Sequence, residues 1–175
     1  MNNKVVYHLF HTFAKQGFSV LRFNFRGVGR SQGTYDRGEG ELSDAASALD
    51  WLQSVNQSAG ACWVAGFSFG AWIGMQLLMR RPEIAGFVSV APPASMYDFT
   101  FLAPCPSSGL IVQGEKDSLV PESSVSKLVS KLQAQRGIEI DYRVVPGADH
   151  FFKNEMDLLS EHVADHLQKA KAPAA

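Results

Sequence analysis

The chain has 175 residues, a length typical of one domain. Hydrophobic residues make up 46% and charged residues 19%, which indicates a folded globular protein rather than a disordered one. The 16 basic and 17 acidic residues give a net charge of −1, and no basic stripe stands out. Nucleic acid and anionic membrane are therefore disfavoured as partners.

The chain also lacks the signatures of export and of a membrane span. Its first residues have neither the long apolar core nor the cleavage site of a signal peptide. Cys62 and Cys105 form no C-x-x-C pair and no metal spacing, as expected of free intracellular thiols. Ala61–Leu78 is mostly apolar, but three glycines interrupt it, so a strand, a turn and a helix explain it better than a membrane helix. We expect a cytoplasmic protein.

Apolar periodicity predicts short strands and helices that alternate along the chain. In chain order we expect a helix over Val5–Gln16, a strand over Phe18–Phe23, a Gly-rich loop over Asn24–Gly40, a helix over Glu41–Val55, a strand over Cys62–Phe67, a helix over Phe69–Arg80, strands over Gly86–Val90 and Gly109–Gln113, a helix over Glu122–Gln133, a strand over Ile138–Val145 and a helix over Asn154–Ala170. Strands separated by helices form βαβ units, which build a mainly parallel sheet covered on both faces. The sequence predicts one three-layer α/β domain over residues 1–170 and a frayed tail over 171–175.

A G-x-S-x-G motif follows the strand that ends at Phe67. Its serine, Ser68, would sit at the tip of a sharp turn from strand into helix, with its hydroxyl exposed. The first N–H groups of the following helix would stabilise negative charge on a carbonyl that Ser68 attacks, and the N–H of Phe69 is the candidate oxyanion donor. The alternative is a Gly-rich turn with an idle serine.

Two further polar residues follow later strands in the order that a serine hydrolase needs. Asp117 comes after the strand ending at Gln113, and His150 comes after the strand ending at Val145. A serine hydroxyl needs a base, and the base needs an acid to fix its tautomer. We predict His150 as the base and Asp117 as the acid, with Glu115 and Asp149 as competing acids.

Other residues near these strand ends are candidates for substrate contact. Phe67, Phe69 and Phe151 either line an apolar substrate pocket or pack in the core. Arg26 follows the first predicted strand and either contacts an anionic substrate or pins its own loop. The four-residue spacing of His162 and His166 can bind a metal, but the H-E-x-x-H pattern is absent and a solvated helix face is favoured.

The combined motifs resemble the small bacterial α/β-hydrolases related to the dienelactone hydrolases. The residues that carry the resemblance are Asn24–Ser31 (NFRGVGRS), Gly66–Gly70 (GFSFG), Gln113–Asp117 (QGEKD) and Pro146–Phe152 (PGADHFF). The resemblance implies an α/β-hydrolase-like fold and a serine hydrolase of carboxylic esters or thioesters, needing no cofactor or metal. It also implies that Arg26 orders its turn.

The expected partner is a small ester-type substrate, and a homodimer is left open. Two alternative functions remain: a peptidase or acyltransferase that uses the same triad, and a catalytically impaired binding protein of the same fold.

The resemblance also has a gap at its start. Relatives of this kind begin with further strands and a loop that supplies a second oxyanion donor. One of their strands lies between the counterparts of Phe18–Phe23 and Cys62–Phe67. Here those two strands must pair directly, or the fold is strained, or the sequence is N-terminally shortened. We favour shortening, because unpaired backbone rows are costly when buried.

Overall fold

The structure is a computed structural model that describes residues 2–171. Its elements, in chain order, are α1 (Lys4–Lys15), α2 (Glu39–Ser54), β1 (Cys62–Phe67), α3 (Phe69–Arg80), β2 (Ile84–Val90), β3 (Gly109–Gly114), α4 (Glu122–Gln133), β4 (Ile140–Val145) and α5 (Met156–Lys171). Most predicted bounds agree within two residues. Of the predicted tail, Lys171 still belongs to α5, and residues 172–175 lie outside the described range.

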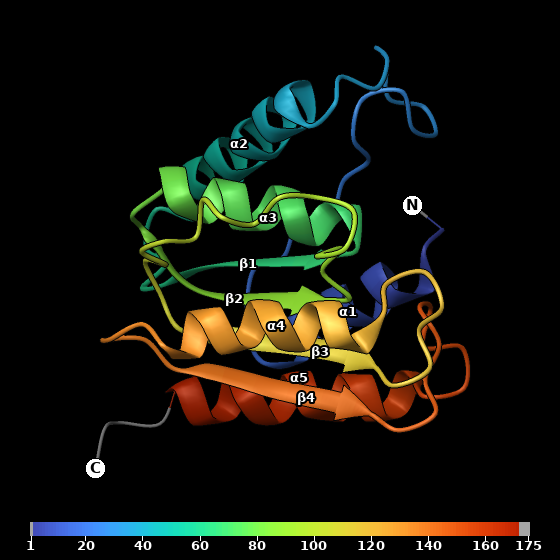
Figure 1. Cartoon of the computed structure of the whole chain (residues 1–175). Helices are drawn as coiled ribbons and strands as arrows, with labels where there is room; N and C mark the ends of the chain where they lie inside the picture. The colour runs from blue at the N-terminus through green and yellow to red at the C-terminus, as the bar shows by residue number, and fades with distance from the viewer. Residues whose placement is uncertain (1, 172–175) are drawn as a thin grey trace.

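The four strands form one parallel sheet in the order β1-β2-β3-β4 (Figure 1). Because the strands run in one direction, their carboxyl ends share one edge of the sheet, where ligands bind in open α/β sheets. The segments that follow β1, β3 and β4 therefore approach one another.

Helices cover both faces of the sheet and bury two separate cores. Helices α3 and α4 pack on one face, where Phe87 and Ile111 point into the core, and α2 packs against α3. Helices α1 and α5 pack on the other, where Leu110 and Val112 point. Adjacent residues of β3 serve opposite cores, which is why the strand is an unbroken apolar run rather than an alternating one. The three-layer prediction is confirmed.

The strand predicted over Phe18–Phe23 does not form. Residues 18–25 run alongside the sheet without strand geometry, and no backbone hydrogen bond joins residues 19–23 to β1 within the described range. Backbone hydrogen bonds hold the segment near its ends, where the Phe18 N–H donates to the Phe13 carbonyl and the Arg26 N–H donates to Asp44 Oδ2. Between them, Arg22 lies over the ring of Phe10. A strand needs a neighbouring strand to pair with, and none pairs with this segment, so direct pairing with β1, one of the three alternatives, does not occur.

A trough of about 1840 Å³ separates this segment from β1. Its walls include Phe23, which is 37% exposed, and the half-buried Val20 and Leu21. Ala65, in the middle of β1, is also exposed. These side chains belong to types that are normally buried in such a sheet. The trough is thus an unfilled part of the fold beside an open sheet edge.

No helix within residues 2–171 is long and apolar enough to cross a bilayer. Ala61–Leu78 instead supplies β1, the following turn and most of α3, as the glycines in it indicated.

Candidate active site

Ser68 lies at the junction of β1 and α3 in a backbone conformation that non-glycine residues rarely adopt, with φ 53° and ψ −120°. The turn is so tight that a Cβ on Gly66 would lie 2.3 Å from the carbonyl oxygen of Gly70. A Cβ on Gly70 would meet nothing within 4 Å, so the two glycines of the motif have different roles. Gly66 permits the close approach, and the turn places Ser68 at the carboxyl edge of the sheet.

The three predicted residues meet at this edge. Ser68 Oγ lies 3.0 Å from His150 Nε2, and His150 Nδ1 lies 2.7 Å from Asp117 Oδ2. The side chain of Asp117 is fully buried and that of His150 is 6% exposed. When Asp117 is ionised, the proton sits on Nδ1, and this N–H donates a hydrogen bond to the carboxylate. Nε2 is then unprotonated and can accept the serine proton.

Asp117 is held by further donors besides His150. Its Oδ1 accepts the N–H groups of Leu119 and Val120 at 2.9 and 2.8 Å. Its Oδ2 also accepts the Gln113 amide at 3.2 Å, and that amide donates to the Val120 carbonyl at 2.9 Å. A buried carboxylate needs such compensation. Sequence reasoning missed Gln113, although a fully buried amide at the end of an apolar strand is a signal for such a role.

The two competing acids have other partners. Glu115 accepts the Gly147 N–H at 2.8 Å and so ties the loop after β3 to the loop after β4. Asp149 accepts the N–H groups of Phe151 and Lys153 at 3.1 and 3.2 Å, which shapes the loop that carries His150. Asp117 is therefore the acid placed beside His150.

The first turn of α3 offers a donor for negative charge. The N–H of Phe69 donates to no acceptor within residues 2–171, whereas Ala71 and Trp72 both donate to the Ser68 carbonyl. Free N–H groups at a helix N-terminus attract anions. This geometry suits an oxyanion formed at Ser68.

Phe67 and Phe151 both contact the His150 ring and lie next to each other. Each ring centroid is 5.1 Å from that of His150, and the two phenyl centroids are 6.0 Å apart. Phe67 is buried, but Phe151 is 53% exposed. Of the two roles expected for these phenylalanines, Phe67 has the core-packing one, whereas Phe151 is exposed and can contact a substrate.

Arg26 is occupied by its own loop. Its guanidinium contacts Asp44 at 2.8 Å and Asp36 at 3.8 Å. The hydrogen bond to Arg26 holds the pKa of Asp44 below its usual value. Arg26 joins residues 24–37 to α2, and this pinning role fits the structure better than contact with an anionic substrate.

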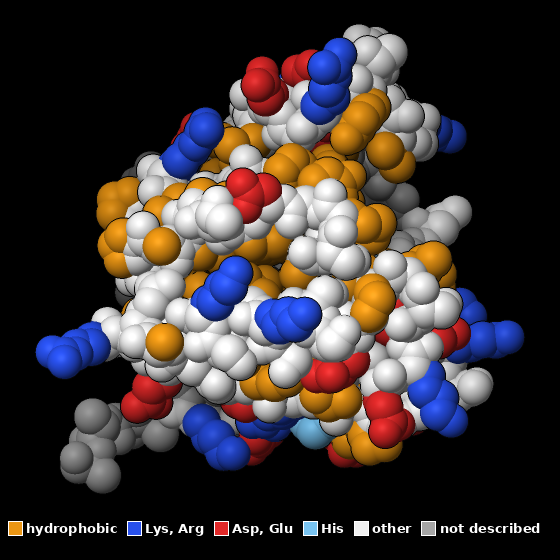
Figure 2. Space-filling model, in the orientation of Figure 1, with side chains coloured by type: hydrophobic (Ala, Val, Ile, Leu, Met, Phe, Trp, Pro, Cys, Tyr) orange, Lys and Arg blue, Asp and Glu red, His pale blue; other side chains and the backbone are white. Residues whose placement is uncertain are grey.

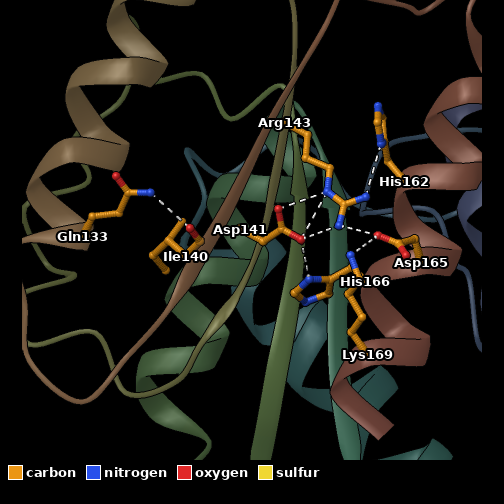
Figure 3. Close-up of polar contacts among 8 residues, drawn as sticks. All are labelled: Gln133, Ile140, Asp141, Arg143, His162, Asp165, His166 and Lys169. Carbon is orange, nitrogen blue, oxygen red and sulfur yellow. Dashed lines mark hydrogen bonds and ion pairs between the residues drawn. The ribbon is translucent and has the colours of Figure 1, made fainter. Parts of the chain in front are cut away.

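The histidine pair on α5 lies in an ion network rather than on a solvated face, which corrects the sequence expectation. Arg143 of β4 donates to Asp141 and to Asp165, each at 2.7 Å (Figure 3). His166 lies 3.0 Å from Asp141, and His162 Nδ1 lies 3.3 Å from the Arg143 guanidinium. Burial first, and the Arg143 charge second, lower the pKa of His162. Arg143 lies at the centre of this cluster and joins β4 to α5. Within residues 2–171, no set of three or more His, Cys, Asp or Glu side chains is grouped so that it could hold a metal ion.

Known proteins resemble the chain over most of its length. The profile of the X-Pro dipeptidyl-peptidase (S15) family matches residues 1–139. An uncharacterised protein of Rickettsia prowazekii is 52% identical over 171 residues, which are 95% of this chain and 72% of the relative.

Solved structures agree with this kinship. An α/β-hydrolase candidate of unknown function from Agrobacterium tumefaciens is 60% identical, with a TM-score of 0.94 over 97% of this chain and 78% of that one. An α/β serine hydrolase homologue from Coxiella burnetii is 37% identical, with a TM-score of 0.83 over 94% of this chain and 76% of that one. A member of the α/β serine hydrolases without a lid, from Xanthomonas campestris, is 31% identical, with a TM-score of 0.87 over 100% of this chain and 77% of that one.

The expected α/β-hydrolase fold is confirmed by these relatives, while the nearer kinship to dienelactone hydrolases stays a prediction. With a profile match over residues 1–139 and the fold of its relatives, the chain belongs to the X-Pro dipeptidyl-peptidase (S15) family, among the α/β serine hydrolases.

Proposed function

We propose that the protein hydrolyses carboxylic esters or thioesters, with Ser68 as nucleophile, His150 as base and Asp117 as the orienting acid. The observation that carries the proposal is the continuous relay from Ser68 Oγ to His150 at 3.0 Å and from His150 to Asp117 at 2.7 Å. Nucleophile, base and acid stand within hydrogen-bond reach of one another, as nucleophilic catalysis by serine requires.

In the first half-reaction Ser68 Oγ attacks the carbonyl carbon while His150 Nε2 takes the hydroxyl proton. The Phe69 N–H stabilises the oxyanion, and His150 then passes the proton to the departing alkoxide or thiolate. The products are an alcohol or thiol and an acyl group esterified to Ser68.

In the second half-reaction His150 takes a proton from water as the water attacks the acyl carbon. The tetrahedral intermediate collapses, and Ser68 leaves with the proton held by His150. Within residues 2–171, the Phe69 N–H is the donor that this proposal uses for the oxyanion. Since each such donor is typically worth about 10²–10³ in rate, we expect modest turnover from this donor alone.

A second candidate is peptide hydrolysis by the same relay, favoured by the match to the X-Pro dipeptidyl-peptidase family over residues 1–139. Short p-nitrophenyl esters compared with an Ala-Pro-p-nitroanilide separate the two functions. Faster turnover of the anilide would replace the ester proposal with the peptidase one.

The test of the nucleophile is intact-mass labelling with a fluorophosphonate. We expect one adduct on the wild type and none on Ser68→Ala, while Ser130→Ala, on the exposed face of α4, is labelled like the wild type. Equal labelling of Ser68→Ala would refute the assignment. A folded wild-type protein without adduct or turnover would favour the non-catalytic alternative.

A further inference from the structure

Four aromatic rings from three segments of the chain gather around the ring of Phe69, the residue that follows Ser68. We call these five rings together the aromatic collar: Phe25 and Tyr35 from the loop before α2, Phe69 and Trp72 from α3, and Tyr97 from the loop after β2. The Phe69 centroid lies between 5.6 and 6.0 Å from each of the other four. Trp72 and Tyr97 are stacked at 4.3 Å.

The aromatic collar lies next to Ser68. Gly38 has φ 98°, and a Cβ there would lie 2.5 Å from the Trp72 ring, so this glycine lets the loop reach the collar. Phe25 and Phe69 line the same trough as Ser68.

The collar and the histidine approach Ser68 from different parts of the fold. His150 comes from the loop after β4, on the far side of the sheet order from β1. The collar residues come from α3, which packs on β1 and β2, and from the loops before α2 and after β2 (Figure 1). The His150 ring contacts Phe67 and Phe151, and within the described residues it makes no ring contact with the collar.

The direction of proton transfer indicates where the leaving group and the acyl group of an ester would lie relative to Ser68. His150 must pass its proton to the leaving group, so that group lies on the histidine side, beside the exposed ring of Phe151. With the carbonyl oxygen facing the Phe69 N–H, the acyl group then extends away from His150, toward the collar.

The chemistry of the collar favours a neutral, flat group. Three charged groups in the loop before α2 and in α2 have partners of their own: Arg26 pairs with Asp44 and Asp36, and Glu41 accepts the Asp36 and Gly38 N–H groups at 2.8 and 2.9 Å. The Trp72 indole N–H is satisfied by the Asp98 carbonyl at 3.0 Å.

An apolar surface is nevertheless left open there. Tyr35 is 61% exposed, and Met96, beside Tyr97 in sequence, is 58% exposed. Figure 2 shows apolar side chains gathered over α2 and α3. Exposed aromatic surface beside a reactive group is typical of a binding site.

We propose that the aromatic collar binds the acyl part of the substrate and selects esters of neutral aromatic acids. This inference rests on the proposed ester hydrolysis and adds the substrate class. An aromatic acyl group stacks on the collar rings, which short aliphatic acyl groups cannot do.

The kinetic test compares p-nitrophenyl benzoate with p-nitrophenyl acetate, which share a leaving group. We expect kcat/KM to favour the benzoate. Tyr35→Ala should lower kcat/KM for the benzoate by about 2- to 12-fold, the range that one aromatic contact supplies, and leave the acetate within about twofold. Tyr35→Phe should keep the preference, and Trp51→Ala, an exposed aromatic residue on α2 outside the collar, should not change it. An equal loss for both esters in Tyr35→Ala would overturn the proposal.

A binding test separates failure of the collar from failure of the hydrolase proposal. In Ser68→Ala, methyl benzoate should quench tryptophan fluorescence saturably, with weaker binding in Ser68→Ala/Tyr35→Ala and loss of the signal in Ser68→Ala/Trp72→Phe. Saturable binding without turnover of any ester by the wild type would refute ester hydrolysis and leave the collar as a binding site for aromatic groups. Absence of saturable binding would overturn the collar even if esters are hydrolysed.

Discussion

Replacing Asp117 tests the orientation of His150 while leaving the nucleophile, Ser68, in place. In Asp117→Asn the amide cannot hold the proton on His150 Nδ1, so Nε2 becomes protonated and no longer accepts from Ser68. We expect kcat/KM for a p-nitrophenyl ester to fall about 10³- to 10⁴-fold, as such a change does in serine hydrolases. Asp50→Asn, on the exposed surface of α2, is the matched control and should behave like the wild type. A larger loss in Glu115→Gln than in Asp117→Asn would make Glu115 the functional acid.

The two glycines of the serine turn offer a second comparison. Gly66→Ala places a methyl group 2.3 Å from the Gly70 carbonyl oxygen, which forces the turn to shift. We expect a loss of about 1–3 kcal/mol in the free energy of unfolding, the usual cost of overpacking. Gly70→Ala meets nothing within 4 Å and gains helix propensity, so its urea midpoint should stay close to that of the wild type. Equal midpoints for the two variants would show that the turn is not crowded.

Sequence reasoning could place Ser68, Asp117 and His150 because each follows a strand, and parallel strands bring such positions to one edge. It favoured Asp117 over Glu115 and Asp149 but could not show what holds each carboxylate, since that depends on which loop N–H groups each one meets. The collar was also beyond its reach. Tyr35 and Tyr97 are far from Ser68 in sequence, and only the packing of two loops against α3 brings them together.

At the scale of elements, the predicted strands that formed are those whose backbone finds a neighbour on the sheet. Cys62–Phe67 pairs with β2, whereas Phe18–Phe23 has similar apolar content and finds no ladder. Strand propensity describes fit to a pleated surface, so it cannot reveal a missing partner. The helices formed where they were predicted because their backbone hydrogen bonds are internal and need no neighbouring strand.

The unpaired edge of β1 predicts a pattern in the hydrogen-exchange rates of its backbone amides. The Ser68 N–H donates to the Val90 carbonyl, so by strand alternation Gly66 also faces β2 while Ala65 and Phe67 point their N–H groups into the trough. We expect the amides of Ala65 and Phe67 to exchange faster than those of Gly66 and Ser68 in hydrogen-exchange NMR. Uniform protection along β1 would mean that the edge is covered in solution.

The ion network between β4 and α5 predicts acid sensitivity. Burial, and next the Arg143 charge, lower the pKa of His162 below its value in the unfolded chain, while Asp141, Asp165 and Glu161 act in the opposite direction. The folded state thus binds the proton less well, and stability present above pH 6.5 is lost as the pH falls below it. The melting temperature should drop between pH 7.5 and 5.5, and less steeply in His162→Gln, which keeps an acceptor for Arg143. The same slope in both proteins would contradict this role.

At the scale of the molecule, the two cores differ in how completely they are closed. Helices α3 and α4 cover one face of the sheet, with α2 packed on α3, and α1 and α5 cover the other, but the trough opens both layers beside β1. Asp117 and His150 follow β3 and β4, on the side of the sheet away from the trough, whereas Ser68 and the collar lie next to the trough beside β1. The histidine and its acid are therefore held more firmly than the acyl side of the site.

An open, apolar sheet edge also promotes association between molecules, because unpaired N–H and C=O groups pair with any extended strand. We expect this chain to self-associate with rising concentration, as measured by sedimentation velocity. Ala65→Lys puts a charge at the exposed centre of the β1 edge and should reduce association, since lysine blocks edge pairing. Ala134→Lys adds the same charge at an exposed position after α4 and should leave association unchanged, which separates the edge effect from net charge. Equal effects of the two substitutions would assign the association to some other surface.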